Sequence, residues 1–68
     1  MPVITIAMHK VDDRTKADLI RNVTDVAVKT TGVPEQAFIV FIDEHEETNI
    51  GLAGKTYKEV KAAREKAS

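Results

Sequence analysis

The residue with the clearest chemical potential is Pro2, which directly follows the initiator methionine. An initiator Met before a small residue such as proline is normally removed, so the mature chain would begin with a secondary amine. Model α-amino groups titrate near ~8, and an apolar surrounding lowers the pKa of a cation. Such an amine would be neutral at physiological pH and able to act as a general base. The alternative is that Pro2 only precedes a strand, where its missing amide donor costs nothing.

Most other catalytic arrangements are absent from the sequence. Without cysteine there is no disulfide, thiolate nucleophile or cysteine metal site, and two histidines are too few for a zinc cluster. No cysteine or zinc metal site is therefore expected. The segment 51–56 resembles the end of a phosphate-binding loop but lacks its first glycine. The acidic run from Asp43 to Glu47 lacks the spacing of a calcium loop, so a solvated loop is expected there.

The histidines and the single tyrosine receive structural interpretations. His9, at the end of a predicted strand, is expected to be a surface or interface residue. His45 lies among carboxylates that would favour its charged form. Tyr57 is expected to anchor the last segment by packing its ring.

The elements that must position Pro2 follow from the hydrophobic pattern. Val3 to Met8 is rich in β-branched residues and predicts a strand. Asp13 to Thr31 has helical periodicity, with an apolar stripe of Leu19, Ile20, Val23, Val26 and Ala27. Phe38 to Ile42 is a continuous apolar run, which is typical of a strand buried on both faces. Strand, helix and strand predict one β-α-β unit of an α/β protein, with parallel strands and a right-handed crossover.

The ends of the helix have their own signals. Asp12 and Asp13 form a good N-cap with acid in the first turn. Gly32 suits the position after the last turn, and Pro34 prevents continuation.

The remainder of the chain predicts a short C-terminal hairpin and helix. Asn49 to Lys55 contains two glycines three apart, which favours a turn or hairpin. Thr56 to Ala67 contains good helix formers with a thin apolar stripe. We therefore expect one domain over residues 1–68, with a core of about 2–55 and a helical extension over 56–68.

Composition limits the partners and the location of the chain. Its 68 residues carry a net charge of −1 and one tyrosine, two phenylalanines and no tryptophan, which argues against nucleic-acid binding. The apolar runs are far shorter than the ~20 residues of a membrane span. The N-terminus lacks the basic region of a signal peptide. A soluble cytoplasmic protein is expected.

The length of the chain and its apolar pattern predict self-association. A chain this short usually needs a disulfide, a metal or oligomerisation to be stable. One helix covers only one face of two strands, while Phe38 to Ile42 is apolar on both faces. A symmetric homo-oligomer is the expected solution.

Several motifs in order carry a family resemblance. The chain resembles the 4-oxalocrotonate tautomerase family through Met1-Pro2, Leu19-Ile20-Arg21, Gly32-Val33-Pro34, the strand Phe38 to Glu44, and Ile50-Gly51-Leu52-Ala53-Gly54-Lys55. The resemblance implies dimers with a four-stranded sheet, usually assembled as a hexamer of three dimers. It implies enol–keto tautomerisation of 2-hydroxydienoates or related 2-oxo acids without a cofactor. Pro2 matches the amino-terminal proline that carries the proton in that family.

The resemblance also implies the residues around the substrate. Family members acting on dicarboxylates have an arginine in the loop after the first strand, where Lys10 would supply the charge here. Ile39 occupies the position of a second family arginine, and Ile50 replaces a pocket-lining aromatic residue. Two alternatives stay open, a structural or binding oligomer on the same fold and a proline-dependent hydratase or decarboxylase.

Overall fold

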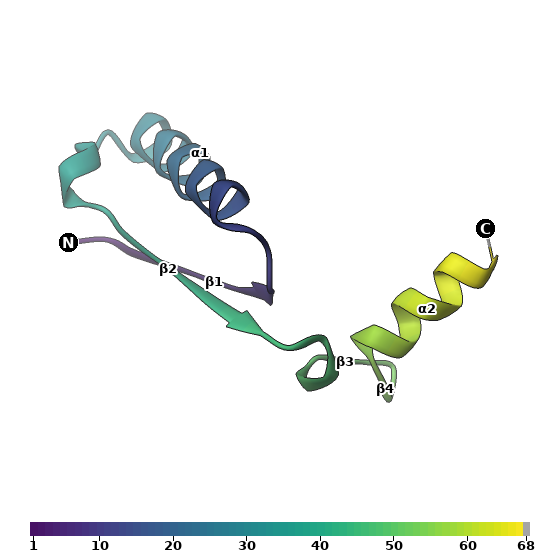
Figure 1. Cartoon of the computed structure of the whole chain (residues 1–68). Coiled ribbons are helices and arrows are strands. Elements are labelled where there is room, and N and C mark those ends of the chain that lie inside the picture. The colour runs from purple at the N-terminus through teal and green to yellow at the C-terminus, as the bar shows by residue number, and fades with distance from the viewer. Residues whose placement is uncertain (68) are drawn as a thin grey trace.

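The computed structural model describes residues 1–67, so Ser68 of the expected extension lies outside the described residues. Figure 1 shows a β-α-β unit followed by a small C-terminal lobe that extends away from it. The molecule is elongated, with principal extents of 45 × 22 × 21 Å. The elements are β1 (Val3–His9), α1 (Asp13–Thr31), a 3₁₀ turn η1 (Glu35–Ala37), β2 (Ile39–His45), a 3₁₀ turn η2 (Glu47–Asn49), β3 (Gly51–Leu52), β4 (Lys55–Thr56) and α2 (Tyr57–Ala67).

The predicted pairing of the two long strands is confirmed. β1 and β2 are parallel and in full register, from Val3 opposite Ile39 to His9 opposite His45. α1 connects them as the crossover helix and lies over one face of the sheet (Figure 1). Side chains alternate along β1, so Ile4 and Ile6 are half-buried while Val3 is exposed. The sheet thus has one face under α1 and one face without a cover.

Both predicted ends of α1 are also confirmed. The carboxylate of Asp12 accepts a hydrogen bond of 2.8 Å from the amide of Thr15, as an N-cap does. At the other end Gly32 adopts φ 75° and donates its amide to the carbonyl of Val28. A left-handed residue at this position favours glycine, which has no Cβ to clash.

The apolar stripe of α1 is wider than the sheet beneath it. Val23 is half-buried, whereas Ile20 is 39% exposed and Val26 is 64% exposed. At ~100° per residue, Ile20 and Val26 lie about 60° to either side of Val23. Within one protomer the stripe is therefore only partly covered, because two strands are too narrow to reach both of its flanks.

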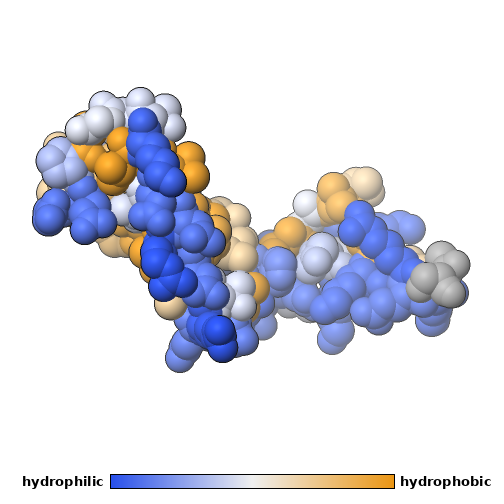
Figure 2. Space-filling view, turned by 90° about the horizontal axis from the view of Figure 1, so that it is seen from above, coloured by the Kyte–Doolittle hydropathy of each residue, from blue (hydrophilic) through white to orange (hydrophobic). Residues whose placement is uncertain are grey.

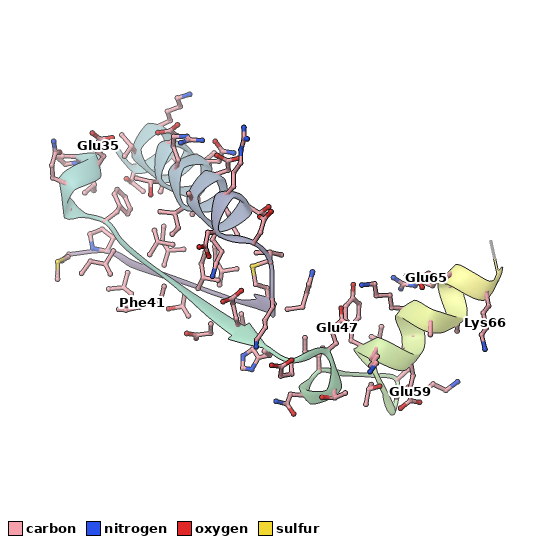
Figure 3. The ribbon with its side chains drawn as sticks, in the orientation of Figure 1. Glu35, Phe41, Glu47, Glu59, Glu65 and Lys66 are labelled. Atoms are coloured by element: carbon pink, nitrogen blue, oxygen red, sulfur yellow. The ribbon has the colours of Figure 1, made fainter. Side chains whose placement is uncertain are left out.

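The open face of the sheet is the largest departure from the predicted burial. Phe41, in the middle of β2, is 54% exposed and points away from α1, as Figure 3 shows. Val3 on the neighbouring strand is also 54% exposed. The expectation that the second strand is buried on both faces is thus not met in the single protomer. Among the side chains of residues 1–66, none is fully buried.

The acidic run after the apolar strand is only partly a loop. The prediction of a solvated loop over 43–47 is wrong for its first half, since β2 continues to His45. Glu44 faces α1 and accepts hydrogen bonds of 3.0 Å from Lys16 Nζ and from the Val11 amide. These contacts hold the start of α1 against the end of β2.

Substitution of Glu44 by glutamine is expected to destabilise the fold at neutral pH. The hydrogen bond from Lys16 and then that from the Val11 amide hold the pKa of Glu44 below its ordinary value. A carboxyl group whose pKa is lowered by folding stabilises the folded state when the pH is above the ordinary pKa of the group. This stabilisation is lost as the pH falls through the folded-state pKa. Thermal unfolding should show a lower Tm for Glu44→Gln at pH 7 and a smaller difference from wild type toward pH 3.

The matched control is Glu46→Gln, which removes a more exposed carboxylate that is paired with Lys10. It should change the Tm less than Glu44→Gln does, because exposed ion pairs contribute little. Equal Tm values for Glu44→Gln and wild type at pH 7 would show that these contacts do not stabilise the fold.

The predicted hairpin and C-terminal helix are present. β3 and β4 pair antiparallel around Ala53 and Gly54, whose φ angles are 55° and 82°. Two successive positive φ angles are typical of the tight turn that matches strand twist. Thr56 belongs to β4 rather than to the helix. Its hydroxyl oxygen accepts a hydrogen bond of 3.1 Å from the backbone amide of Glu59.

The C-terminal lobe makes few contacts with the β-α-β unit. Lys61 of α2 pairs with Glu47 of η2 at 3.3 Å, which ties the helix to the preceding turn. Figure 2 shows that the surface of this lobe is mostly hydrophilic, while hydrophobic residues are exposed along the flank of the β-α-β unit. Within the described residues, no helix is both long and apolar enough to cross a membrane.

Candidate active site

Pro2 lies at the amino end of β1, beside the first residue of β2. Its carbonyl accepts a hydrogen bond of 3.0 Å from the amide of Ile39. Pro2 is half-buried, whereas Met1 before it is 86% exposed. An exposed Met1 is accessible to an aminopeptidase, and its removal would free the ring nitrogen of Pro2. The sequence-predicted residues Pro2 and Ile39 are therefore neighbours in the protomer.

Lys10 and Ile50 lie at the other end of the sheet. Lys10 directly follows β1, so seven strand residues separate it from Pro2. At ~3.3 Å per residue this is about 25 Å, too far for direct interaction. Ile50 precedes β3, and its carbonyl accepts the amide of Tyr57 at 2.7 Å. One protomer thus contains two separate halves of the predicted site.

The second half contains a hollow at the carboxyl ends of the two long strands. Its volume is about 420 Å³, and it is lined by Ala7, Met8, His9, His45, Ile50 and Tyr57. The rings of His9 and Tyr57 contact each other, with centroids 5.4 Å apart and planes inclined by 33°. Met8, Ala7 and Ile50 give the hollow an apolar wall.

Sequence reasoning did not connect His9, His45 and Tyr57 with a common site. A signal for the two histidines was present, because each ends a seven-residue strand and the strands start in register. Equal lengths in a parallel pair place the last residues side by side. No sequence signal placed Tyr57 there, since its position depends on the path of the hairpin.

Lys10 keeps its charge at the rim of this region. It pairs with Glu46, and that hydrogen bond is the main cause that raises the pKa of Lys10 above its ordinary value. Its side chain remains 61% exposed and able to reach a ligand. Within the part of the chain that the structure describes, no group of three His, Asp or Glu side chains converges to hold a metal ion.

Comparisons with known proteins agree with this fold. The family model described as Tautomerase enzyme matches residues 2–59. A 2-hydroxymuconate tautomerase of Bacillus subtilis is 36% identical over 56 residues, which cover 81% of this chain and 90% of that protein. The chain belongs to the tautomerase family, and its activity is that of a tautomerase, an isomerase.

Solved structures show the same fold. DmpI from Helicobacter pylori is 29% identical and superposes with a TM-score of 0.79, covering 85% of this chain and 98% of that chain. TomN, a 4-oxalocrotonate tautomerase homologue in the tomaymycin biosynthetic pathway, has a TM-score of 0.85 over 90% of this chain and 95% of that chain. At 24% identity the second likeness shows the fold alone. The predicted α/β class and the predicted family are both confirmed.

Proposed function

We propose that this protein interconverts the enol and keto forms of 2-hydroxydienoates or related 2-oxo acids, with the amine of Pro2 as the general base. The observation that carries the proposal is the position of Pro2 directly before β1, in a chain of the tautomerase family. Met1, which precedes Pro2, is 86% exposed. The Bacillus subtilis relative named for 2-hydroxymuconate supports an unsaturated 2-hydroxy acid as the type of substrate.

The reaction needs only a proton carrier. The ring nitrogen of Pro2 takes the proton of the 2-hydroxyl group. The C2 carbonyl forms as the electrons of the C2–C3 double bond move toward C3. The same nitrogen then returns the proton to C3, or to C5 of a conjugated diene. Nothing is oxidised or reduced, so no co-reactant is required. A base that works near neutral pH is most effective when its pKa lies near that pH.

The two halves of the site would meet between two copies of the chain. The outer edge of β1 has no strand partner within the described residues. If two copies of β1 pair antiparallel with full overlap, Val3 lies opposite His9, Ile6 lies opposite its own copy, and Pro2 lies opposite Lys10. This register keeps residues of equal parity opposite each other, so both α1 helices cover the same face of a four-stranded sheet.

Such a dimer would place Pro2 of one copy beside the hollow of the other. Lys10 of the second copy would then add a like charge that disfavours protonation of the Pro2 amine. The apolar wall of the hollow would disfavour it further. The open sheet face, with its exposed Val3 and Phe41, would be covered when three dimers form a hexamer. We place this assembly in the cytoplasm.

The test combines intact mass with a direct assay. Purified protein should lack Met1 and should ketonise phenylenolpyruvate and 2-hydroxymuconate, followed by ultraviolet absorbance. The rate should rise with pH through a pKa below the ordinary value of an α-amino group. A chain that retains Met1 and is inactive would instead favour a structural or binding oligomer. Hydration or decarboxylation of the supplied substrate without tautomerisation would favour a proline-dependent hydratase or decarboxylase.

Ile39 is expected to limit the use of dicarboxylate substrates. A guanidinium binds a carboxylate through charge-assisted hydrogen bonds worth ~1.5–3 kcal/mol, and isoleucine offers none. A loss of about 3 kcal/mol from the transition state slows a reaction roughly a hundredfold. Ile39→Arg should therefore raise kcat/KM for 2-hydroxymuconate by roughly ten- to a hundredfold and change that for phenylenolpyruvate much less.

The control is Ile39→Leu, which keeps an apolar side chain and should leave the ratio of the two substrates unchanged. A wild-type preference for the dicarboxylate would show that another residue, such as Lys10, supplies the charge. The placement of Ile39 in the substrate pocket would then be wrong.

A further inference from the structure

The hollow contains hydrogen-bonding rings that the proline mechanism leaves unused. Its polar groups are the imidazoles of His9 and His45 and the phenol of Tyr57, and its remaining wall is apolar. Imidazole and phenol groups donate hydrogen bonds and also present flat faces to a ligand. The residues that line the hollow include no arginine. This chemistry suits a planar, conjugated ligand with few charges.

We propose that His9 donates a hydrogen bond to the 2-oxygen of a planar aryl or alkenyl 2-oxo monocarboxylate, and that Tyr57 holds the imidazole in position. The assignment rests on the proposed tautomerase function, and it identifies the group that polarises the substrate oxygen. His9 is a catalytic residue in this scheme because it touches the reacting oxygen. Tyr57 is a positioning residue.

The geometry restrains His9 at its backbone and at its ring. Its backbone belongs to β1, opposite His45 in the register of the sheet. Its ring packs against that of Tyr57 at a centroid distance of 5.4 Å. The Tyr57 amide in turn donates to the Ile50 carbonyl at 2.7 Å, which fixes the start of α2 next to the hollow. A donor held in this way needs little reorganisation when the reaction occurs.

His9 is favoured over His45 by burial and by position. His9 is half-buried, whereas His45 is exposed and has no ring contact within the described residues. In the antiparallel pairing of two β1 strands, His9 lies opposite Val3 of the second copy. That position is next to Pro2 of the second copy, so base and donor would flank one substrate.

The role of His9 follows from the charge that develops during proton transfer. When Pro2 of the second copy takes the proton from the 2-hydroxyl, negative charge builds on the 2-oxygen before C3 receives the proton. A hydrogen bond from the imidazole is then stronger in the transition state than with bound substrate. Interactions of this kind raise kcat and change KM little.

The first experiment compares substitutions with phenylenolpyruvate as substrate. His9→Leu should lower kcat about a hundredfold with a KM change below threefold, as loss of one donor to a developing oxyanion costs 10²–10³ in other enzymes. His9→Gln restores a donor and should recover at least tenfold of that loss. Tyr57→Leu should lower kcat more than Tyr57→Phe, because the ring is what holds His9. Lys58→Ala, an exposed neighbour on α2, is the control for the helix itself.

Either of two results with the His9 variants would overturn the assignment. One is a His9→Leu variant with wild-type kcat, and the other is an equal loss for His9→Leu and His9→Gln with unchanged assembly by sedimentation. His45→Leu provides the matched comparison on the neighbouring strand. A larger loss of kcat for His45→Leu than for His9→Leu would also overturn the assignment, because the donor would then lie on β2.

The second experiment separates this inference from the proposed function. The ligand phenylglyoxylate is an aryl 2-oxo monocarboxylate that carries the 2-oxygen but has no hydrogen on C3, so it cannot tautomerise and its binding requires no activity of Pro2. Added to the wild-type protein or to Pro2→Ala, it should shift the ring-proton NMR signals of His9 and Tyr57 more than those of His45. Absence of tautomerase activity with these shifts present would defeat only the proposed function. Saturating binding without a His9 shift would defeat the inference.

Discussion

Covering the nitrogen of Pro2 is expected to abolish most of the activity. A chain with one alanine inserted between Met1 and Pro2 would begin with Ala after Met removal, and Pro2 would carry an ordinary amide nitrogen. An amide is not basic at neutral pH, so the general base is lost while the side chains of the site remain. General acid–base catalysis contributes typically 10²–10⁴-fold, and we expect kcat/KM to fall within that range. The assay is ketonisation of phenylenolpyruvate, with intact mass confirming the new terminus.

Pro2→Ala provides the graded comparison, because its mature chain starts with a primary amine at the same position. It should retain more activity than the insertion and show a different pH profile. Addition of one alanine after Ser68 is the matched control for chain length and should leave the rate unchanged. If the insertion variant keeps full activity, Pro2 is not the base. If Pro2→Ala keeps both the rate and the pH profile, the ring of Pro2 does not set the pKa that controls the reaction.

Replacement of Phe41 by aspartate is expected to prevent assembly. Phe41 is 54% exposed in the protomer, in the middle of the uncovered sheet face. Burying such a side chain stabilises an interface by ~1.5–3 kcal/mol, and symmetry repeats the contribution in every copy. An aspartate there would have to be desolvated without a partner, which costs free energy instead. Sedimentation at micromolar concentration should show the wild type as an oligomer and Phe41→Asp as monomeric or unfolded.

Phe41→Leu is the control, since it keeps an apolar side chain at the same place. It should sediment like the wild type, with a lower Tm because the smaller side chain fills less space. A compact, stable wild-type monomer would contradict the predicted oligomer. Assembly of Phe41→Asp with wild-type stability would show that the open sheet face is not an interface.

The elements of the fold were largely predictable because their signals are local. Asp12 caps α1 and Gly32 ends it, as the residue types alone indicate. The apolar runs of β1 and β2 and the helix between them allow few other topologies, since parallel strands need a crossover connection. The residues at which the elements end were less predictable. β2 extends to His45 because Glu44 is held by Lys16 and the Val11 amide, and such a long-range contact leaves no local pattern in the sequence.

The sequence by itself determined the family and the candidate base, because Pro2 needs only its place in the chain to present a secondary amine. It did not determine how the site residues are distributed. Only the tertiary structure places Pro2 with Ile39 at one end of the sheet and Ile50 with His9 and Tyr57 at the other. The physical reason is that the separation depends on the parallel register of β1 and β2 and on the path of the hairpin. These are set by contacts between residues far apart in the chain.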